Sequence, residues 1–572
     1  MPVHNADIAA AFRRLADLLE IEGENPFRVR AYRNAAATVG GLPRDVAGMI
    51  ADGADLSELP GIGDDLAAKI AEMVETGSLH LLEEIETRVP PGLSDMARVP
   101  GLGPKRVKAI HEALGIDTIE ALERAARNGE LRRLSGFGAK TERNILDQLA
   151  RFEGVEKRFR LIDAEHIAEP LVAYIRGIDG VKQAVIAGSY RRQKETVGDL
   201  DILVTAKDGA AVIDRFVAYD EVGDIVSKGT TRSTVMLKSR FQVDLRVVPE
   251  VSYGAALFYF TGSKAHNIEL RKRAIRRGWK LNEYGLFEGD DRIAGKTEEE
   301  IYEKLALPFI VPQLRENRGE IEAAEKGALP DLVSLEDIRG DLHCHTTASD
   351  GKYSIREMAE AAKDRGYAYL GITDHSKSQT VAGGMSEDEL AAQIDEIDAL
   401  NEELDGIRVL KSCEVDILSD GKLDFPDKLL SRLDYTVCSI HGAFNLSREK
   451  QTERVLRAMD NPHFTILGHS TGRLINQRPP YDIDLEAVMD AARERGCYLE
   501  LNAQPSRLDI DDIHCKMARD LGLKVPISTD AHSTDGLEMM RFGIAQAGRG
   551  WLEAKDVLNT LPLEKLLKAF GR

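Results

Sequence analysis

The chain has 572 residues, too many for a single hydrophobic core, so we expect three or four domains. Its composition is 43% hydrophobic and 30% charged, and no apolar run reaches the roughly 20 residues that a membrane-spanning helix needs. The N-terminus lacks a signal-peptide pattern, and none of the five cysteines forms a C-x-x-C pair. These features predict a cytoplasmic protein with small buried cysteines and argue against membrane and disulfide-rich classes.

A net charge of -20 is unusual for a protein that binds nucleic acid, because phosphate contacts require Lys and Arg. The charge is uneven, however, since residues 151–280 are net basic and the segments on both sides are acidic. A cluster at the end of the basic segment is either a phosphate-binding surface or the solvated face of a helix: Arg271, Lys272, Arg273, Arg276, Arg277 and Lys280.

Residues 1–150 are predicted to be helical, and a short glycine motif occurs three times in them. It reads L-P-G-I-G at 59–63, V-P-G-L-G at 99–103 and L-S-G-F-G at 134–138. A G-h-G turn before a helix exposes backbone N–H groups that can hold a phosphate. One copy would fit any helical hairpin, but three favour helix-hairpin-helix modules, which bind the DNA backbone without reading bases. The predicted DNA contacts are Gly61, Gly63, Gly101, Gly103, Gly136 and Gly138.

Between residues 155 and 310 the pattern becomes α/β, with strand-like runs at 183–187, 201–205, 233–237 and 242–248. Asp199 and Asp201 enter the second run two residues apart, so both side chains point to one face, and Asp244 lies within the last run. Three converging carboxylates can hold two divalent cations about 3.5–4 Å apart for phosphoryl transfer. We expect Mg²⁺ or Mn²⁺ at this site.

A candidate phosphate cradle precedes these aspartates. Gly188 and Ser189 supply a backbone turn and a hydroxyl for a triphosphate, and Arg192 adds a fixed positive charge. A D-x-D pair alone is often only a strand end. The glycine-serine pair before it and the third aspartate after it make the pattern far more specific, and together they predict a nucleotidyltransferase.

Residues 1–315 resemble the family X DNA polymerases. The segment 188–203 matches that family's catalytic motif nearly throughout, and 259–262 resembles its segment that walls the sugar pocket and excludes a ribose 2′-hydroxyl. The resemblance implies gap filling in DNA repair, with dNTPs and gapped or 3′-recessed DNA as substrates. It assigns Asn267 to the minor-groove edge of the base and Arg271 to the template strand. The implied nucleotide-binding set is Gly188, Ser189, Arg192, Gly198, Tyr259, Phe260, Gly262, Asn267 and Arg271.

Several positions depart from the family, among them Phe27 and Arg28, which replace a histidine–lysine pair. Lys264 stands where the beta-type enzymes have an aspartate over the incoming base. Residues 1–75 resemble the family's lyase domain, in which a lysine attacks an abasic-site sugar, and the match falls on Lys69. Asp65 replaces a family lysine one turn earlier, and an anion there favours the charged ammonium. An ordinary exposed helix lysine is the alternative interpretation of Lys69.

From residue 338 onward, short strand-like runs alternate with amphipathic helices, which predicts a parallel, barrel-like α/β domain. Its seven runs are 341–345, 369–373, 409–414, 435–440, 465–467, 498–501 and 526–528. Imidazoles and carboxylates follow the ends of these runs, where barrel active sites lie. They are too many for one ion and predict a cluster of two or three, with Zn²⁺, Mn²⁺ or Fe²⁺ suitable. The predicted ligands are His343, His345, Asp350, His375, Glu414, His441, His469, Asp530 and His532.

This region resembles the PHP (polymerase and histidinol phosphatase) domains, distorted seven-stranded barrels with three metal ions. The resemblance implies one ion held by His343, His345, Glu414 and Asp530, a second by Glu414, His441 and His469, and a third by Asp350, His375 and His532. Arg473 is either a phosphate contact or an ordinary loop arginine. Attached to a polymerase, such a domain implies 3′→5′ exonuclease or 3′-end processing activity.

The predicted fold is therefore a multidomain α+β and α/β chain: a helical N-terminal region, an α/β nucleotidyltransferase palm with a thumb, and a C-terminal PHP barrel. The expected segments are a lyase-like domain 1–85, a helix-hairpin-helix domain 86–155, a palm 156–250, a thumb 251–314, a linker 315–337 and the PHP domain 338–572. We expect a monomer that acts on the nucleoid. Two alternatives stay open, a DNA-end-binding scaffold with one silent centre and a polymerase fused to a small-molecule phosphatase.

Overall fold

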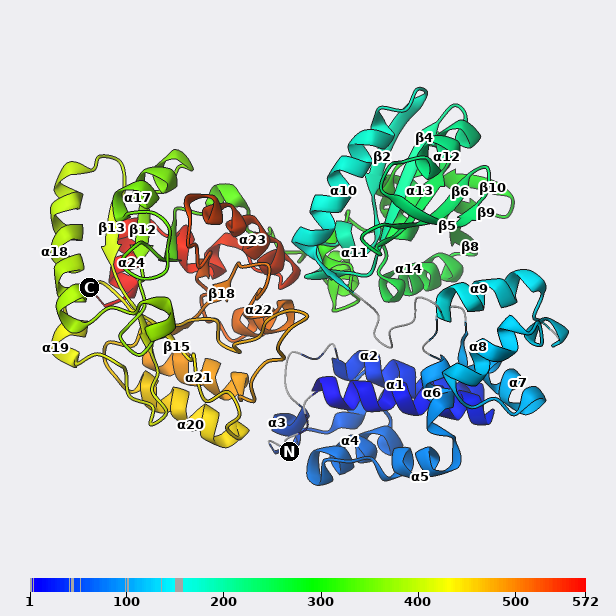
Figure 1. Cartoon of the computed structure of the whole chain (residues 1–572), viewed down its shortest axis with the longest axis horizontal. Helices are drawn as coiled ribbons and strands as arrows, with labels where there is room; N and C mark the ends of the chain where they lie inside the picture. Colours follow the sequence, from blue (N-terminus) through cyan, green and yellow to red (C-terminus); the bar gives the residue numbers. More distant parts are fainter. Residues whose placement is uncertain are drawn as a thin grey trace. The chain divides into compact units, whose positions relative to one another are not determined.

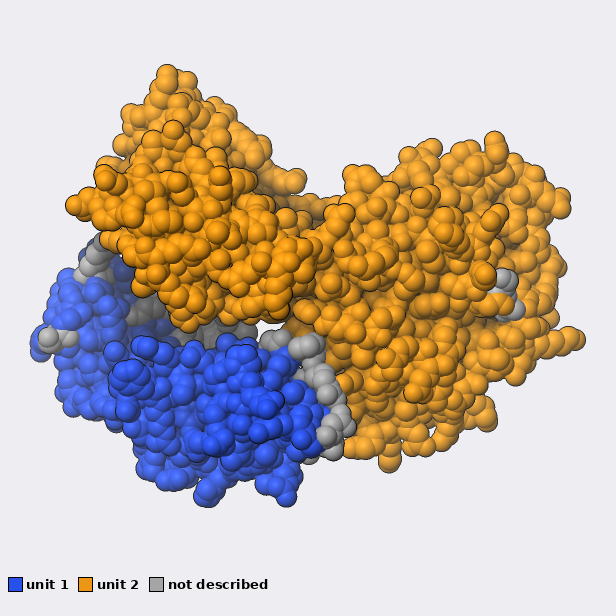
Figure 2. All heavy atoms as spheres, turned by 180° about the vertical axis from the view of Figure 1, so that it is seen from behind, with its two compact units in different colours: residues 1–157 blue, residues 158–572 orange. Residues whose placement is uncertain are grey.

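A computed structural model describes residues 3–571, except 4, 41, 43–45, 52, 98, 100–101, 135 and 150–157. The chain forms two compact units, residues 1–157 and 158–572, which are coloured separately in Figure 2. Within the described part of the chain, every helix is too short or too polar to cross a lipid bilayer. All five cysteines are buried and carry no disulfide, as predicted.

The first unit is helical, which confirms the prediction for this part of the chain (Figure 1). One hydrophobic core runs through it from Val3 to Leu149, so the segments 1–85 and 86–155 share a core. The described helices are α1 (Asn5–Glu22), α2 (Pro26–Gly40), α3 (Val46–Ala51), α4 (Asp64–Thr76), α5 (His80–Arg88), α6 (Pro91–Ala97), α7 (Pro104–Leu114), α8 (Ile119–Arg127) and α9 (Ala139–Leu149), with 3₁₀ turns η1 (Leu56–Glu58) and η2 (Leu131–Arg133).

The palm is a five-stranded sheet in the order β2-β4-β7-β6-β5, in which only the pair β4 and β7 is parallel. Four strands coincide with the predicted runs. The fifth, β5, is an edge strand whose side chains are mostly exposed, so it has little apolar alternation to detect. The strands are β2 (Val181–Ile186), β4 (Asp199–Ala206), β5 (Val222–Lys228), β6 (Arg232–Leu237) and β7 (Gln242–Val247).

The two faces of the palm sheet are covered differently. Helices α10 (Leu161–Arg176) and α12 (Gly209–Val217) pack on the face that carries Leu200, Ile202 and Val204. Leu203, on the opposite face, packs with Ala256 and Leu257 of helix α13 (Tyr253–Thr261). Side chains alternate along a strand, so Asp199 and Asp201 lie on the α13 face.

The thumb follows the palm and contains helices and a small antiparallel sheet, β10-β9-β8. The segment 315–337, predicted as a linker, packs against it, because Arg315 is fully buried and Ile321 and Ala324 join the thumb core. The elements are α14 (Lys264–Arg276), β8 (Trp279–Asn282), β9 (Gly285–Glu288), β10 (Asp291–Ala294), α15 (Glu298–Lys304), η4 (Pro312–Leu314), α16 (Glu320–Glu325) and η5 (Leu335–Asp337).

The C-terminal domain has parallel ladders in the orders β11-β12-β13, β14-β15-β16-β17 and β18-β19. Single bridges from Cys344 to Ala531 and from His375 to Glu414 connect the ladders. Each predicted run contains a strand, and the runs 409–414 and 498–501 are each divided between two ladders. The strands are β11 (Gly340–Cys344), β12 (Tyr369–Ile372), β13 (Arg408–Lys411), β14 (Glu414–Asp416), β15 (Val437–Ser439), β16 (Ile466–Leu467), β17 (Tyr498–Leu499), β18 (Leu501–Asn502) and β19 (Ile527–Ser528).

Helices surround these strands, and one end of the domain joins the palm. Ile475, Leu508 and Phe542 belong to the palm's hydrophobic core, and Trp551 belongs to the thumb's. The second unit is therefore continuous across its catalytic halves. The helices are α17 (Ile355–Asp364), α18 (Glu387–Glu403), α19 (Asp427–Leu430), α20 (Arg448–Met459), α21 (Leu485–Arg495), α22 (Asp512–Asp520), α23 (Met540–Arg549) and α24 (Leu563–Ala569).

Candidate active sites

Three carboxylates meet on one face of the palm sheet. In the parallel pair β4 and β7, Asp201 lies directly opposite Asp244. Asp199 precedes Asp201 by two residues and shares its face. Asp244 is held by hydrogen bonds from Thr234 Oγ1 (2.6 Å) and Gln242 Nε2 (2.9 Å). The structure thus places the three predicted aspartates side by side.

The electrostatics of this carboxylate site favour a cation. Burial, followed by repulsion from Asp199 and Asp244, raises the pKa of Asp201 to about 7. Clustered carboxylates are costly to ionise together unless positive charge compensates them. A divalent cation would supply that charge, so an all-oxygen set of three carboxylates fits Mg²⁺ or Mn²⁺.

The predicted phosphate cradle lies next to these aspartates. Helix α11 (Gly188–Arg191) begins at Gly188, whose φ of +63° favours glycine. A Cβ on Gly188 would lie 3.0 Å from the Asp201 Oδ2 atom, so glycine lets the turn approach the carboxylate closely. Ser189 follows on the first turn of α11, and Gly198 directly precedes β4.

Arg192 connects the cradle to the predicted sugar-pocket segment. Its Nη1 donates to the carbonyl of Thr261 (2.5 Å), and its Nε donates to Glu316 Oε1 (2.9 Å). A Cβ on Gly262 would lie 3.3 Å from Arg192 Nη1, so this glycine also permits a close approach. Residues of the phosphate cradle and of the predicted sugar-pocket segment therefore lie in one site.

The remaining predicted nucleotide contacts lie on α13 and α14. Asn267 donates from Nδ2 to the carbonyl of Tyr259 (2.7 Å), and the guanidinium of Arg271 lies 5.9 Å from the centre of the Tyr259 ring. Tyr259 and Phe260 pack edge to face, with ring centres 5.1 Å apart. Lys264, the position that departs from the family, is exposed at the start of α14.

The three glycine turns of the first unit have a common construction. The apolar residue between the glycines, Ile62, Leu102 or Phe137, is buried in the core. Gly63 and Gly103 are the N-caps of α4 and α7, and neither helix has a side-chain cap bond. Gly61 and Gly136 have φ values of +76° and +82°, and Gly138 directly precedes α9. The predicted contact Gly101 lies outside the described residues.

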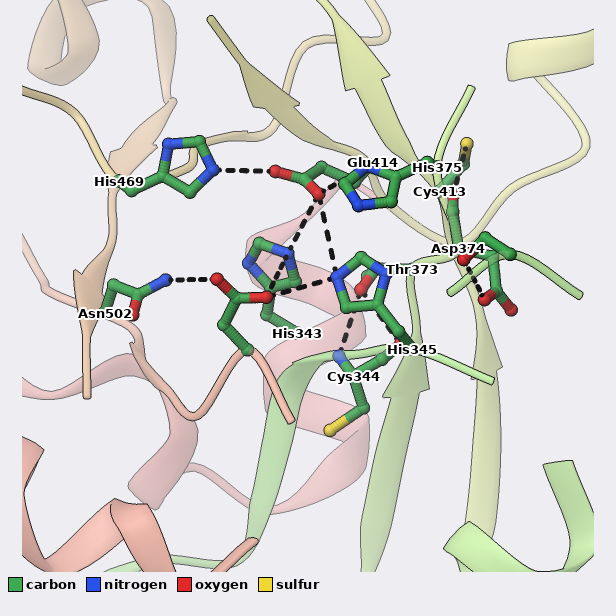
Figure 3. Close-up of polar contacts among 12 residues, drawn as sticks. His343, Cys344, His345, Thr373, Asp374, His375, Cys413, Glu414, His469 and Asn502 are labelled. Carbon is green, nitrogen blue, oxygen red and sulfur yellow. Dashed lines mark hydrogen bonds and ion pairs between the residues drawn. The ribbon is translucent and has the colours of Figure 1, made fainter. Parts of the chain in front are cut away.

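In the C-terminal domain five predicted histidine ligands surround Glu414, and Figure 3 labels four of them, His343, His345, His375 and His469. The Glu414 carboxylate lies 2.9 Å from His375 Nδ1, 2.9 Å from His469 Nε2 and 3.3 Å from His441 Nε2. His343 and His345 approach it to 3.5 and 3.6 Å. The described residues form three potential metal-binding groups: His343, His345 and Asp530; His375, Glu414 and His441; and His345, Asp350, His375 and His532.

These groups fit metal ions by their chemistry. Among the described side chains, His343 Nε2, His345 Nε2 and His469 Nδ1 are buried without a hydrogen-bond partner, an arrangement that is costly unless a ligand satisfies it. Burial opposes protonation of His375, but Glu414 and Asp350 outweigh it and raise its pKa to about 10. The nitrogen and carboxylate donors suit Zn²⁺, Mn²⁺ or Fe²⁺.

Strained backbone supports two of the ligands. His469 and Asp530 have φ values of +26° and +52°, a region that residues with side chains rarely occupy. Such conformations persist where the surrounding structure enforces them, and they cluster at functional sites. Here they direct an imidazole and a carboxylate into the same centre.

The residues that orient the histidines were not predicted from the sequence. Glu500 Oε1 lies 2.7 Å from His343 Nδ1, and its Oε2 accepts the backbone N–H of His469 (2.7 Å). Asp416 bonds His441 Nδ1, and Asn502 donates to Asp530 (3.1 Å). Such partners fix the tautomer and the direction of metal-binding imidazoles. All three residues lie at or next to the ends of short strands, as the predicted ligands do, so their position in the sequence could have indicated them. They lie outside the ligand motifs.

Two candidate residues have partners elsewhere. Arg473 donates to Glu195 Oε2 (2.6 Å) and to the carbonyl of Arg507 (2.8 Å), so its guanidinium is engaged with the palm rather than the histidine cluster. Lys69 donates from Nζ to Asp65, the anion that separates this chain from the lyase pattern. The ammonium of Lys69 is therefore paired.

Family models match most of the chain. A helix-hairpin-helix domain matches residues 3–79, a SAM-like helix-hairpin-helix tandem 93–151, a DNA polymerase beta palm 162–241, a DNA polymerase beta thumb 256–316 and a PHP domain 341–504.

Similar proteins fall into two groups. The DNA polymerase/3′-5′ exonuclease PolX of Bacillus subtilis (strain 168) is 37% identical over 566 residues, which cover 98% of each chain. A probable phosphatase of Thermoanaerobacter sp. (strain X514) is 32% identical over 231 residues, which cover 38% of this chain and 89% of that protein. A probable phosphatase of Caldanaerobacter subterraneus is 30% identical over 203 residues, 34% of this chain and 75% of that protein.

Proposed function

Since the chain belongs to the bacterial PolX family, the family X DNA polymerases with a C-terminal PHP domain, we propose that it is a DNA polymerase with a second, hydrolytic centre acting on DNA 3′ ends. The observation that carries the polymerase half is the direct pairing of Asp201 with Asp244 beside the Gly188 turn. Its substrates are dNTPs and gapped or 3′-recessed DNA, and it acts as a monomer.

At the palm, Asp199, Asp201 and Asp244 would hold Mg²⁺ or Mn²⁺. Bound cations lower the pKa of an attacking 3′-hydroxyl and neutralise the triphosphate. The chain's own part is positioning. Gly188 and Ser189 offer a backbone turn and a hydroxyl to the phosphates, and Arg192 supplies positive charge at the junction with the sugar-pocket segment. Asn267 and Arg271 would contact the nascent base pair and the template.

At the PHP centre, the nine predicted ligands would hold two or three ions of Mn²⁺, Zn²⁺ or Fe²⁺. Bound ions activate water and neutralise a phosphodiester. Glu500 and Asp416 keep His343 and His441 turned toward the centre. Joined to a polymerase in one compact unit, this centre has a DNA 3′ end as its proposed substrate, and the name of the Bacillus relative includes this activity.

A second candidate substrate is a small phosphomonoester, because the C-terminal region is also similar to probable phosphatases. Hydrolysis of 3′-labelled DNA and of a small phosphomonoester such as histidinol phosphate, measured with the same protein and metal, distinguishes the two substrates. We expect the DNA to be preferred, and a preference for the small ester would contradict the proposal for this centre.

The polymerase assignment is tested on 5′-labelled gapped DNA with dNTPs and Mg²⁺ or Mn²⁺. Asp201→Ala should reduce nucleotide addition at least ~10³-fold, because loss of a metal ligand removes several kcal/mol of transition-state stabilisation. DNA binding should persist. Asp220→Ala, in the exposed turn before β5, is the matched control and should extend normally. Near wild-type extension by Asp201→Ala would contradict the assignment.

A further inference from the structure

A chain of ion pairs connects the phosphate cradle of the palm to the PHP half. Arg549, at the end of α23, is buried and donates from Nη1 both to the backbone carbonyl of Arg192 (2.9 Å) and to Glu316 Oε1 (3.0 Å). Its Nη2 donates to Asp512 Oδ2 (2.5 Å), which also pairs with Arg318 (3.0 Å). The predicted triphosphate contact Arg192 thus shares its carboxylate partner with an arginine of the other catalytic half.

The position of this network gives it influence over the cradle. Residues 192–195 connect α11, which carries the cradle, to the short strand β3 (Thr196–Val197) and then to β4, which carries Asp199 and Asp201. Arg549 holds the first residue of this connection by its carbonyl, and Arg473 holds Glu195 by its side chain (2.6 Å). Two PHP arginines therefore fix both ends of a short palm segment.

The charges in the network explain why Arg549 matters to Arg192. Three guanidinium groups share two carboxylates, and Lys194 adds a further positive charge, so the network keeps an excess of positive charge next to the cradle. Without Arg549, Arg192 would be the only arginine paired with Glu316, and more of its positive charge would be neutralised. The backbone carbonyl of Arg192 would also lose its buried hydrogen-bond donor. Burial disfavours the Glu316 anion, but Arg549, Arg192 and Lys194 outweigh it and lower its pKa to about 2. The carboxylate is thus ionised and available to both arginines.

We propose that Arg549 of the PHP half is a positioning residue for the polymerase, which holds Arg192 in place and leaves it enough positive charge to bind the triphosphate. This inference rests on the proposed nucleotide role of Arg192. Arg549 would affect dNTP binding without touching the nucleotide, because it acts through Glu316 and the Arg192 backbone.

Steady-state extension of gapped DNA by the full-length protein tests the proposal. Arg549→Ala should raise the KM for dNTP about tenfold and change kcat less than threefold, while 3′-end degradation stays at the wild-type rate. Arg549→Lys keeps the charge but cannot span both carboxylates and the carbonyl, so its KM should be intermediate. Arg541→Ala is the matched control, since Arg541 lies on the same helix and forms its ion pair with Glu165 of the palm (2.6 Å) rather than with Glu316 or Asp512.

The outcomes separate the possible explanations. An unchanged KM in Arg549→Ala, or an equal rise in Arg541→Ala, would overturn the proposal. If Arg549→Ala loses both activities through misfolding, Arg549→Lys decides, and a wild-type KM in that variant overturns the proposal. Arg192→Ala should also raise the KM for dNTP. If it does not, the proposed nucleotide site is wrong; if it does while Arg549→Ala has no effect, only the link through Arg549 fails.

Discussion

Glu414 contacts more of the histidine cluster than a single metal ligand usually does. Five imidazoles lie within 3.6 Å of its carboxylate, and its side chain is almost fully buried. Burial disfavours its anion, but His441, His375 and His343 outweigh burial and hold the pKa of Glu414 well below its usual range. A carboxylate whose ionised form is favoured in this way, in the middle of the cluster, is suited to binding more than one cation.

Glu414→Gln should therefore lower the metal content of the purified protein and reduce 3′-end degradation at least ~10³-fold, because one missing ligand affects two ions. Metal analysis by mass spectrometry and a degradation assay measure the two effects. Glu403→Gln, at the exposed end of α18, changes the same charge without touching the cluster and should alter neither. Unchanged metal content in Glu414→Gln would exclude the bridging role.

Individual metal ligands could be predicted because the sequence pattern that identifies them is local. A histidine or carboxylate after a strand-like run is visible in a few residues of sequence, and parallel strands bring such positions to one end. Glu500 was not predicted, because its role depends on two histidines more than thirty residues away, His343 and His469. Arg473 shows the same limit, since its partner Glu195 is 278 residues distant.

At the level of elements, α14 and its C-cap Arg277 carry the basic cluster except Lys280, which lies in β8, and the cations have different roles. Arg273 and Arg277 donate to the carbonyl of Leu305, so they hold the end of α14 against the end of α15 within the thumb. Lys272 and Arg276 are exposed. Some cations of this cluster are therefore structural, and others are accessible to a phosphate backbone.

Binding to duplex DNA should fall steeply with salt and depend little on sequence, because interactions with the phosphate backbone dominate. Replacing Lys272 and Arg276 by Gln should reduce the slope of log K against log [salt] by about 0.9 for each phosphate that is no longer neutralised. Lys363→Gln with Lys428→Gln, exposed on the PHP half, makes the same change in net charge and should preserve the slope. Equal slopes for both pairs would remove α14 from the DNA-binding surface.

The ion pairs of Glu316 also predict how stability depends on pH. Its pKa of about 2 is below the ordinary value near 4.5, so its contribution is complete above pH 4.5 and is lost as pH falls toward 2. The shift corresponds to about 3 kcal/mol. Glu316→Gln cannot titrate, so the stability difference between wild type and variant should shrink by that amount between pH 5 and pH 2.

Thermal or urea unfolding of both proteins across this pH range measures the effect. Glu303→Gln, on the exposed face of α15, controls for the loss of any acidic group and should follow the wild type. A stability difference between wild type and Glu316→Gln that stays constant with pH would show that the carboxylate is not held by its arginines in solution.

Elements with strong alternation or strand-end motifs were predicted well, and elements without them were not. β5 escaped detection because its side chains are largely exposed. The segment 315–337 is polar enough to suggest a linker, yet Arg315 is buried among the rings of Phe258, Tyr302 and Phe309. Pairing with Glu298 satisfies its charge, and no local pattern reveals a partner 17 residues away.

Across the whole molecule, the two catalytic centres have separate ligand sets. His343→Ala with His345→Ala should abolish end degradation and leave primer extension within about threefold of wild type, because no palm carboxylate contributes to the histidine cluster in the described residues. Asp199→Ala with Asp201→Ala should do the reverse. Both activities of both variants are measured on one gapped substrate. Loss of extension in the histidine pair would mean that metal binding supports the polymerase fold.

Domain order and chemistry were readable from sequence, but the joint between the catalytic halves was not. Local motifs identify the palm and the PHP centre separately. The packing of Phe542 and Leu508 into the palm core, and the sharing of Glu316 by two arginines, depend on three-dimensional neighbours that no motif encodes.

That shared packing constrains how the gene can change. Ile475, Leu508 and Phe542 complete the palm core, and Trp551 completes the thumb core. Substitutions on either side of this joint must therefore be accommodated by the other side. The polymerase half and the PHP half should accumulate compensating substitutions together. A chimaera that exchanges the PHP half between distant relatives would bring together packing surfaces that have not changed together. Recombination between the palm and the PHP half should therefore be poorly tolerated.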